Sequence, residues 1–140
     1  MKNYPSRPNL DGCRIFIPKD TQEKTALPLV IRVHGGGFVV NSPAGADALV
    51  RRLAGHANCI VVNIDYSKAP QNPFPIGHED VISQTLAVID DAKLPIDKSK
   101  AVLSGGSSGG NLVLGAAQAS QLRPKILGVV ANYARFIWTG

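Results

Sequence analysis

Cysteine is scarce in this sequence. Its two cysteines, Cys13 and Cys59, are too few for a disulfide framework and follow no metal-ligand spacing, so we expect buried free thiols and no metal site. The first residues contain no apolar segment of the kind that a secretory signal requires. No apolar run approaches the length of about eighteen residues that a membrane-spanning helix needs. These absences predict a cytoplasmic protein without a membrane span.

Acidic residues are fewer than basic ones. Ten Asp and Glu stand against fifteen Lys and Arg, which gives a formal net charge of +5. A nucleic-acid surface would need the basic residues gathered on one face, with aromatic side chains between them. Here they are scattered, and the densest pair is Arg51 and Arg52. We therefore predict no nucleic-acid partner.

Glycine and proline divide the sequence into alternating apolar runs and amphipathic stretches. Runs at 14–17, 29–33, 59–64, 101–103 and 126–131 predict strands, and helical periodicity predicts helices at 43–57, 76–91 and 111–121. The side chains expected to face the core are Ala46, Leu49, Val50 and Leu53 in the first helix, and Val81, Ile82, Thr85, Leu86 and Ile89 in the second. Residues 65–75 contain three prolines and predict a loop. This alternation predicts an α/β fold with a doubly wound, mostly parallel sheet and helices on both faces.

The sequence GGSSG at residues 105–109 follows a predicted strand and precedes a predicted helix. In a G-x-S-x-G turn the serine oxygen is exposed above the sheet, and a side chain at Gly105 or Gly109 would clash with the neighbouring strand or helix. The helix behind Ser107 would also direct its positive dipole end toward a developing oxyanion. A flexible Gly/Ser loop is also consistent with these residues, and the motif alone does not distinguish such a loop from a catalytic serine turn. A phosphate-binding loop does not fit, because neither G-K-[ST] nor G-x-G-x-x-G is present.

The sequence HGGGF at residues 34–38 ends another predicted strand. Consecutive glycines let the backbone approach a bound carbonyl and direct amide N–H groups at it, and each such donor is worth about 3 kcal/mol in a transition state. The alternative is a tight loop with a structural histidine. The occurrence of both motifs in this order favours the oxyanion loop.

Together these stretches resemble the hormone-sensitive-lipase-like family of α/β-hydrolases, which includes many esterases. The resemblance rests on residues 34–38, on SSGGNL at 107–112, and on DYSKAP at 65–70 with the PFP and ED that follow it. It covers residues 27–133. It implies carboxylic-ester hydrolysis without a cofactor, with Ser107 as nucleophile and the N–H groups of Gly35, Gly36 and Ser108 as oxyanion hole. A small-molecule ester is the implied substrate, and His34, Gly37, Gly105 and Gly109 support the two motifs.

Several polar residues receive structural roles. In the family the segment that begins at Asp65 helps to hold loops under the active site, and His34 shapes the oxyanion loop without acting as a base. We expect His56 to be solvated on a polar helix face. His78 is expected near the start of a helix, with a role at the rim of the pocket as the alternative. Phe136 and Trp138 are expected to be hydrophobic filler.

The expected catalytic triad is incomplete in this sequence. A hydrolase of this fold orders its triad as Ser, then Asp or Glu, then His, but no histidine, aspartate or glutamate follows Ser107. We therefore expect a partial hydrolase core at residues 29–133, preceded by a segment at 1–28 with one edge strand and followed by a divergent tail at 134–140. The leading hypothesis is a truncated, inactive esterase. The alternatives are a receptor-like module that binds a small molecule and a non-functional product.

The last predicted strand, at residues 126–131, would leave an apolar sheet edge exposed. Such an edge offers unpaired backbone groups to another chain. We therefore expect marginal stability and self-association.

Overall fold

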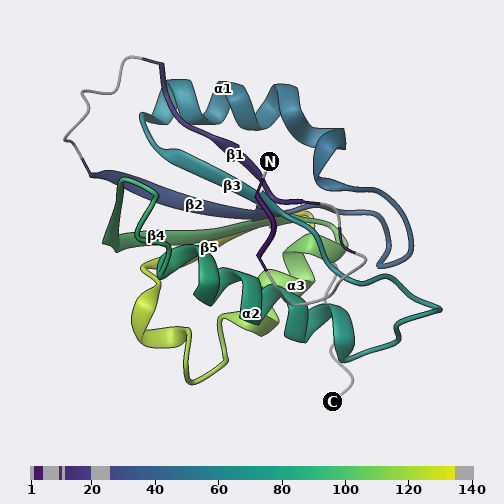
Figure 1. Ribbon diagram of the computed structural model, residues 1–140. Helices are drawn as coiled ribbons and strands as arrows, with labels where there is room; N and C mark the ends of the chain where they lie inside the picture. Colours follow the sequence, from purple (N-terminus) through teal and green to yellow (C-terminus); the bar gives the residue numbers. More distant parts are fainter. Residues whose placement is uncertain (1, 5–9, 11, 20–25, 135–140) are drawn as a thin grey trace.

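The computed structural model describes residues 2–4, 10, 12–19 and 26–134, and in this part of the chain one five-stranded sheet crosses the molecule (Figure 1). The strands are β1 (Arg14–Phe16), β2 (Leu27–Val33), β3 (Ile60–Ile64), β4 (Ile96–Gly106) and β5 (Gly128–Asn132). Their order is β1-β3-β2-β4-β5. The pairs β3–β2, β2–β4 and β4–β5 are parallel, and β1 is antiparallel to β3. The predicted fold class is confirmed.

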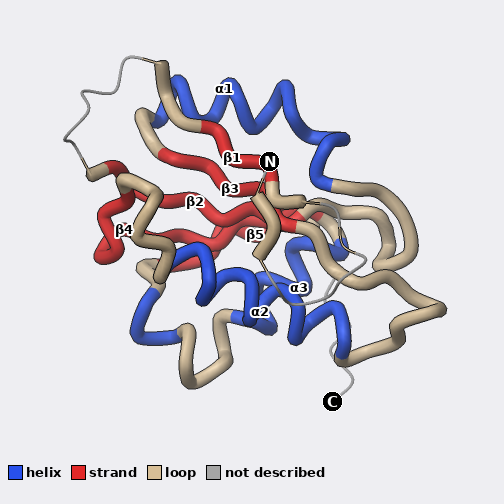
Figure 2. The backbone as a smooth tube through the Cα atoms, viewed as in Figure 1, coloured by secondary structure: helices blue, strands red, loops and turns tan. Residues whose placement is uncertain are grey.

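Helices cover both faces of this sheet (Figures 1 and 2). A 3-10 turn at Pro43–Ala46 leads directly into α1 (Asp47–Ala57), which lies on one face. On the opposite face lie α2 (Ile76–Ile89) and α3 (Ser108–Ala116), which contact each other. A second 3-10 turn, Arg123–Lys125, precedes β5. The β2–β3 crossover therefore covers one face, and the β3–β4 and β4–β5 crossovers cover the other, as expected for a doubly wound sheet of right-handed crossovers.

Two hydrophobic clusters hold the layers together, one on each face. In β2 the residues alternate between buried and half-buried, so that Leu29, Ile31 and Val33 join the larger cluster under α2 and α3. Val30 points the other way and packs against the smaller cluster, which includes Val50 and Ala54 of α1. All five residues of β3 are buried, as expected for a strand covered on both faces.

The observed elements differ from the predicted ones mainly at their ends. The strand β4 begins at Ile96, earlier than the predicted start at residue 101. The polar residues that follow Ile96 do not show the apolar pattern of a buried strand. The helix α3 begins at Ser108 and ends at Ala116, earlier than predicted at both ends.

One core prediction in the first helix is wrong. Leu49 is 57% exposed, whereas Val50 and Ala54 are buried. The segment 43–46 is a 3-10 turn with fewer residues per turn, so the α-helical phase starts only at Asp47 and Leu49 falls beside the buried stripe. The other expected core residues of the two helices are buried or packed against the clusters.

Both cysteines are free and buried, as predicted.

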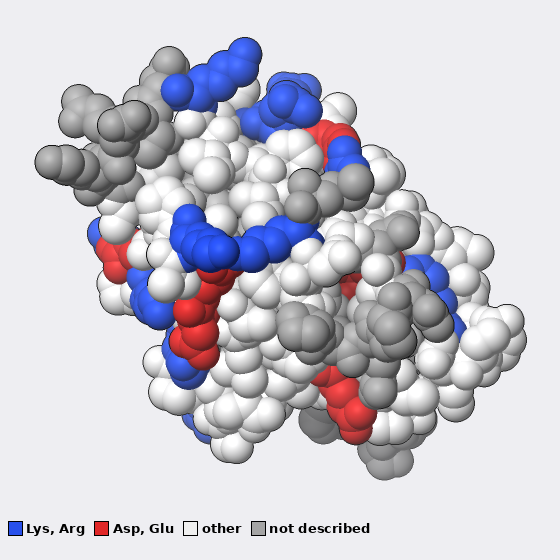
Figure 3. Space-filling view, in the orientation of Figure 1, with Lys and Arg blue, Asp and Glu red and all other residues white. Residues whose placement is uncertain are grey.

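Within the described residues, no helix is long and apolar enough to cross a membrane. Figure 3 shows Lys and Arg side chains in several separate groups on one face, some beside acidic side chains. The tail from residue 135, with Phe136 and Trp138, lies outside the described residues.

Candidate active site

Ser107 lies on the sharp turn between β4 and α3. Its backbone dihedral angles are φ 54° and ψ −125°, a conformation that is strained for a residue with a side chain. The Ser107 N–H donates a hydrogen bond to the Asn132 carbonyl at the end of β5, with 3.0 Å between nitrogen and oxygen. The neighbouring strand therefore helps to hold the strained turn.

Glycine is required on both sides of this serine. A Cβ atom added to Gly105 would lie 2.3 Å from the carbonyl oxygen of Gly109. A Cβ atom added to Gly109 would lie 2.3 Å from the Val33 oxygen and 2.5 Å from the His34 oxygen. The turn thus brings α3 into close contact with β4 and with the end of β2, as the sequence predicts.

The glycine loop after β2 packs directly against the serine turn. A Cβ atom on Gly35 would lie 2.8 Å from the Gly106 oxygen and 3.3 Å from the Ser107 Cβ. Gly36 has φ 141°, and its carbonyl accepts hydrogen bonds from the N–H groups of Val39 and Val40. The structure therefore brings together two motifs that are about seventy residues apart in the sequence.

Backbone N–H groups of the glycine loop and of the first turn of α3 lie near Ser107. Within the described part of the chain, the N–H groups of Gly35 and Gly36 have no hydrogen-bond acceptor. The N–H of Ser108 belongs to the first turn of α3, where helical N–H groups have no acceptor inside the helix. The same helix end carries partial positive charge. This arrangement can stabilise negative charge on a bound oxygen.

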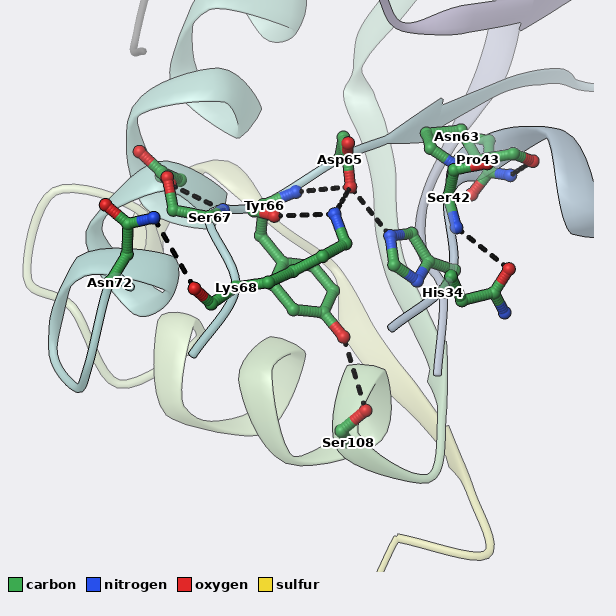
Figure 4. Close-up of polar contacts among 12 residues, drawn as sticks. His34, Ser42, Pro43, Asn63, Asp65, Tyr66, Ser67, Lys68, Asn72 and Ser108 are labelled. Carbon is green, nitrogen blue, oxygen red and sulfur yellow. Dashed lines mark hydrogen bonds and ion pairs between the residues drawn. The ribbon is translucent and has the colours of Figure 1, made fainter. Parts of the chain in front are cut away.

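His34, which precedes the glycine loop, and Asp65 form a buried pair, and Figure 4 shows their contact. Asp65 Oδ1 lies 2.8 Å from His34 Nε2, 2.6 Å from Lys68 Nζ and 2.9 Å from the Tyr66 nitrogen, so one carboxylate oxygen accepts three hydrogen bonds. Burial raises the pKa of Asp65, but the hydrogen bonds from His34 and Lys68 outweigh it, and the pKa is below its usual value. Asp65 therefore has a structural role as a charged acceptor that holds His34, Tyr66 and Lys68 together.

Both nitrogens of the His34 ring are occupied by acceptors. While Nε2 contacts the Asp65 carboxylate, Nδ1 lies 2.8 Å from the carbonyl oxygen of Gly35. A carbonyl and a carboxylate both accept, so each contact is a hydrogen bond where the ring nitrogen carries a proton. His34 thus holds the glycine loop and has no free nitrogen for the hydroxyl of Ser107.

Tyr66 connects this pair to the start of α3. Its ring stacks on His34 with 4.6 Å between ring centroids, and its hydroxyl lies 3.3 Å from Ser108 Oγ. Gln84 of α2 donates to the Asp65 carbonyl at 2.7 Å, and Asp80 accepts from the Ser67 N–H at 2.8 Å. These contacts were not predicted from the sequence. Their signal was two polar residues on the apolar face of α2.

The other two histidines lie away from the serine. His56 is exposed near the end of α1, where its Nδ1 contacts the Arg52 carbonyl oxygen. His78 lies near the start of α2 and borders a cavity of about 270 Å³ that also contains Phe38, Phe74 and Leu112. Its expected position near the helix start is confirmed, and it also lies at the rim of this second cavity.

Ser107 opens into a cavity of about 500 Å³ between the sheet and the start of α1. Its lining residues include Arg32, His34, Gly35, Gly36, Leu49 and Tyr133. In the part of the chain described, no group of three His, Cys, Asp or Glu residues could hold a metal ion. The chemistry available in this cavity is that of a serine hydroxyl beside backbone N–H groups.

Comparisons with known proteins identify the family of this chain. A family model described as the alpha/beta hydrolase fold matches residues 30–139. The probable carboxylesterase 8 of Arabidopsis thaliana is 32% identical over 142 residues, an alignment that covers 88% of this chain and 43% of that protein. The gibberellin receptor GID1A of the same plant is 37% identical over 91 residues, which cover 61% of this chain and 26% of the receptor.

A solved structure gives the same result. The thermostable carboxylesterase EstE1, cloned from a metagenomic library, superposes with a TM-score of 0.82 and 31% identity over 91% of this chain and 44% of that one. The chain therefore spans less than half the length of these relatives. With most of its residues matched by the family model, the chain belongs to the hormone-sensitive-lipase-like, carboxylesterase-like family of the α/β-hydrolase fold.

Proposed function

We propose that this chain supplies the nucleophile and the oxyanion hole of a carboxylic ester hydrolase. The observation that carries the proposal is the contact between the two glycine motifs, in which the Gly35 backbone lies against Ser107. In this proposal, the oxygen of a carbonyl bound at Ser107 Oγ would accept hydrogen bonds from the N–H groups of Gly35, Gly36 and Ser108. The esterases among the relatives support the same chemistry.

In the proposed reaction, Ser107 Oγ attacks the ester carbonyl carbon and loses its proton to a base. The carbonyl oxygen becomes an oxyanion that accepts hydrogen bonds from the three N–H groups. Collapse of this intermediate expels the alcohol, which takes a proton, and leaves an acyl group on Ser107. Attack by water releases the carboxylic acid and restores the serine. Each half of the reaction needs a base close to Oγ.

We propose that the base and its acidic partner come from residues that are not among these 140. His34 uses both ring nitrogens in contacts with Gly35 and Asp65. His56 is exposed on α1, and His78 borders a different cavity from Ser107. Loss of the histidine in related chemistry costs on the order of 10⁶ in turnover, while oxyanion donors and binding leave roughly 10³-fold acceleration over water. The chain alone is therefore expected to be almost inactive.

The test is hydrolysis of p-nitrophenyl acetate by the purified chain and by Ser107→Ala, with and without imidazole as an external base. Ser120→Ala is the matched control, because Ser120 is an exposed serine beyond the end of α3. We expect little hydrolysis without imidazole. With imidazole, we expect an increase above the rate of imidazole alone that disappears in Ser107→Ala and persists in Ser120→Ala.

Two outcomes would overturn parts of this proposal. Rapid hydrolysis without imidazole that depends on Ser107 would mean that a residue of this chain acts as the base. Identical rates for Ser107→Ala and the parent chain in imidazole, with both proteins folded, would mean that Ser107 is not a nucleophile.

A binding function without catalysis is the second candidate. Two observations favour it. Both ring nitrogens of His34 have other contacts, so His34 cannot act as the base. The chain is also similar to a gibberellin receptor over 61% of its length. In this proposal the cavity at Ser107 retains a small molecule and does not convert it. Saturable binding of an ester that stays intact, in the presence of imidazole, would favour this candidate over hydrolysis.

A further inference from the structure

The cavity at Ser107 contains a cation that the proposed ester chemistry does not use. Arg32 lies on β2, two residues before His34, and its side chain lines the same cavity as Ser107. Its neighbours in register are Asn63 on β3 and Ser104 on β4, which are both uncharged. Arg32 therefore lines the candidate active site and has no charged neighbour in register on the adjacent strands.

Arg32 has no anionic partner among the described residues. Its Nη1 atom is buried from solvent and has no hydrogen-bond partner. No aspartate or glutamate is among the residues that line the cavity in the described part of the chain. Asp47 follows the lining residue Ala46 and Asp65 contacts the lining residue His34, but both carboxylates have other partners: Asp47 binds Arg14, and Asp65 binds His34 and Lys68.

This unpaired guanidinium group is also partly desolvated. Burial lowers the pKa of Arg32, and the phenol of Tyr133 opposes this change. A guanidinium group nevertheless stays charged in a protein. A buried charge without a partner is costly, so a ligand that brings an anion gains binding free energy from relieving that cost.

The geometry keeps Arg32 close to the nucleophile. Tyr133, which interacts with Arg32, packs its hydroxyl against the serine turn, where a Cβ atom on Gly106 would lie 2.7 Å from that oxygen. Both residues line the cavity of about 500 Å³ with Ser107, Gly35 and Gly36. A small molecule can therefore contact Arg32 and the N–H groups of the glycine loop at the same time.

We propose that Arg32 binds a carboxylate of the ligand in the Ser107 cavity, so that the preferred ester carries a negative charge on its acyl or alcohol part. The ester part of this statement rests on the proposed function. The guanidinium fork matches the two oxygens of a carboxylate, which a neutral ester cannot supply. The positive end of α3 adds attraction for an anion in the same cavity.

The experiment compares the binding of monomethyl succinate, an ester with a free carboxylate, with that of neutral dimethyl succinate. Both are titrated by NMR into the Ser107→Ala chain, in which neither ester can acylate the serine. We expect monomethyl succinate to bind about tenfold tighter or more. Arg32→Gln in the same background should abolish the preference. Arg52→Gln, which removes an exposed arginine of α1 outside the cavity, should retain it.

Equal affinity for the two esters, absence of binding to the folded chain, or a preference that survives Arg32→Gln would overturn the inference. If Arg32→Gln does not fold, the Nε–H signal of Arg32 in the Ser107→Ala chain decides, since it should shift with monomethyl succinate and not with dimethyl succinate. Because binding is measured without turnover, the two proposals fail separately. A preference for the anion without any Ser107-dependent hydrolysis would contradict only the proposed function.

Discussion

At the scale of single residues, one oxygen of Asp65 connects three parts of the candidate site. It accepts hydrogen bonds from His34 at the end of β2, from Lys68 in the loop 65–75 and from the backbone of Tyr66. Because His34 also contacts the Gly35 carbonyl, the position of the glycine loop depends on this carboxylate. The charge on Asp65 therefore contributes both to stability and to the geometry around Ser107.

Asp65→Asn is expected to destabilise the fold at neutral pH by about 3 kcal/mol, since it removes the charged acceptor of Lys68, His34 and the Tyr66 N–H in a buried position. The pKa of Asp65 is lowered from 3.8 in the folded chain, so its contribution is complete well above that value and is lost as the pH falls through the folded-state pKa. The difference between the parent chain and Asp65→Asn should therefore shrink below about pH 4. Urea unfolding at pH 7, 5 and 3 measures it.

Asp90→Asn is the matched control for this prediction. The Asp90 side chain is 58% exposed, and its partners Lys98 and Lys125 are also at the surface. An exposed pair contributes well under about 1 kcal/mol, so this variant should unfold close to the parent chain. A difference for Asp65→Asn that is small at pH 7, or that grows on acidification, would contradict the role assigned to the carboxylate.

Sequence patterns predicted the local parts of the site but not its long-range contacts. The turn at Ser107 can be predicted from the residues around it, because only glycine fits at positions 105 and 109. The hydrogen bond between Tyr66 and Ser108 joins residues 42 apart, and no local pattern encodes it. Gln84 was equally hidden, since a single polar residue in an amphipathic helix does not reveal its partner.

At the scale of elements, the strand–turn–helix unit from β4 to α3 depends on close backbone packing. Gly109→Ala would place a Cβ atom within 2.5 Å of two carbonyl oxygens at the end of β2. Backbone atoms cannot move aside as a flexible side chain can, so we expect a loss of about 3 kcal/mol or more in unfolding free energy. Thermal unfolding followed by circular dichroism tests it.

Gly55→Ala provides the opposite control within the same molecule. Gly55 lies in α1, and a Cβ atom there meets nothing within 4 Å. Alanine should stabilise an exposed helical position by about 0.5–1 kcal/mol relative to glycine. Similar effects of the two substitutions would contradict the packing account of the turn.

Element types could be predicted from the sequence more securely than element phases. The alternation of apolar runs and helical stretches predicted the parallel sheet, because β3 and β2 are mostly apolar, with Asn63 and Arg32 as exceptions. The orientation of Leu49 could not be predicted, because the 3-10 turn before α1 shifts the phase of the helix. The size of this shift cannot be inferred from the residue pattern. The start of α3 at Ser108 was missed because glycines in a first turn resemble a loop.

At the scale of the whole molecule, the two edges of the sheet differ. On one side the antiparallel strand β1 ends the sheet and packs beside α1. On the other side β5 pairs only with β4, and its outer edge has no strand partner in the described part of the chain. Around it Leu127, Val130 and Tyr133 are 69%, 51% and 80% exposed. We propose the β5 edge as the surface that would mediate self-association of the chain.

Val130→Lys is expected to weaken this self-association. A parallel strand edge with apolar side chains invites pairing with a second chain, and a lysine placed there opposes it by charge repulsion and hydration. Sedimentation velocity over a hundredfold range of concentration should show dimers or larger species for the parent chain and a shift toward monomer for Val130→Lys. Phe74→Lys is the control, because Phe74 is 85% exposed but lies in the loop 65–75, away from the β5 edge. A parent chain that stays monomeric throughout, or an equal effect of both lysines, would mean that the β5 edge does not mediate association.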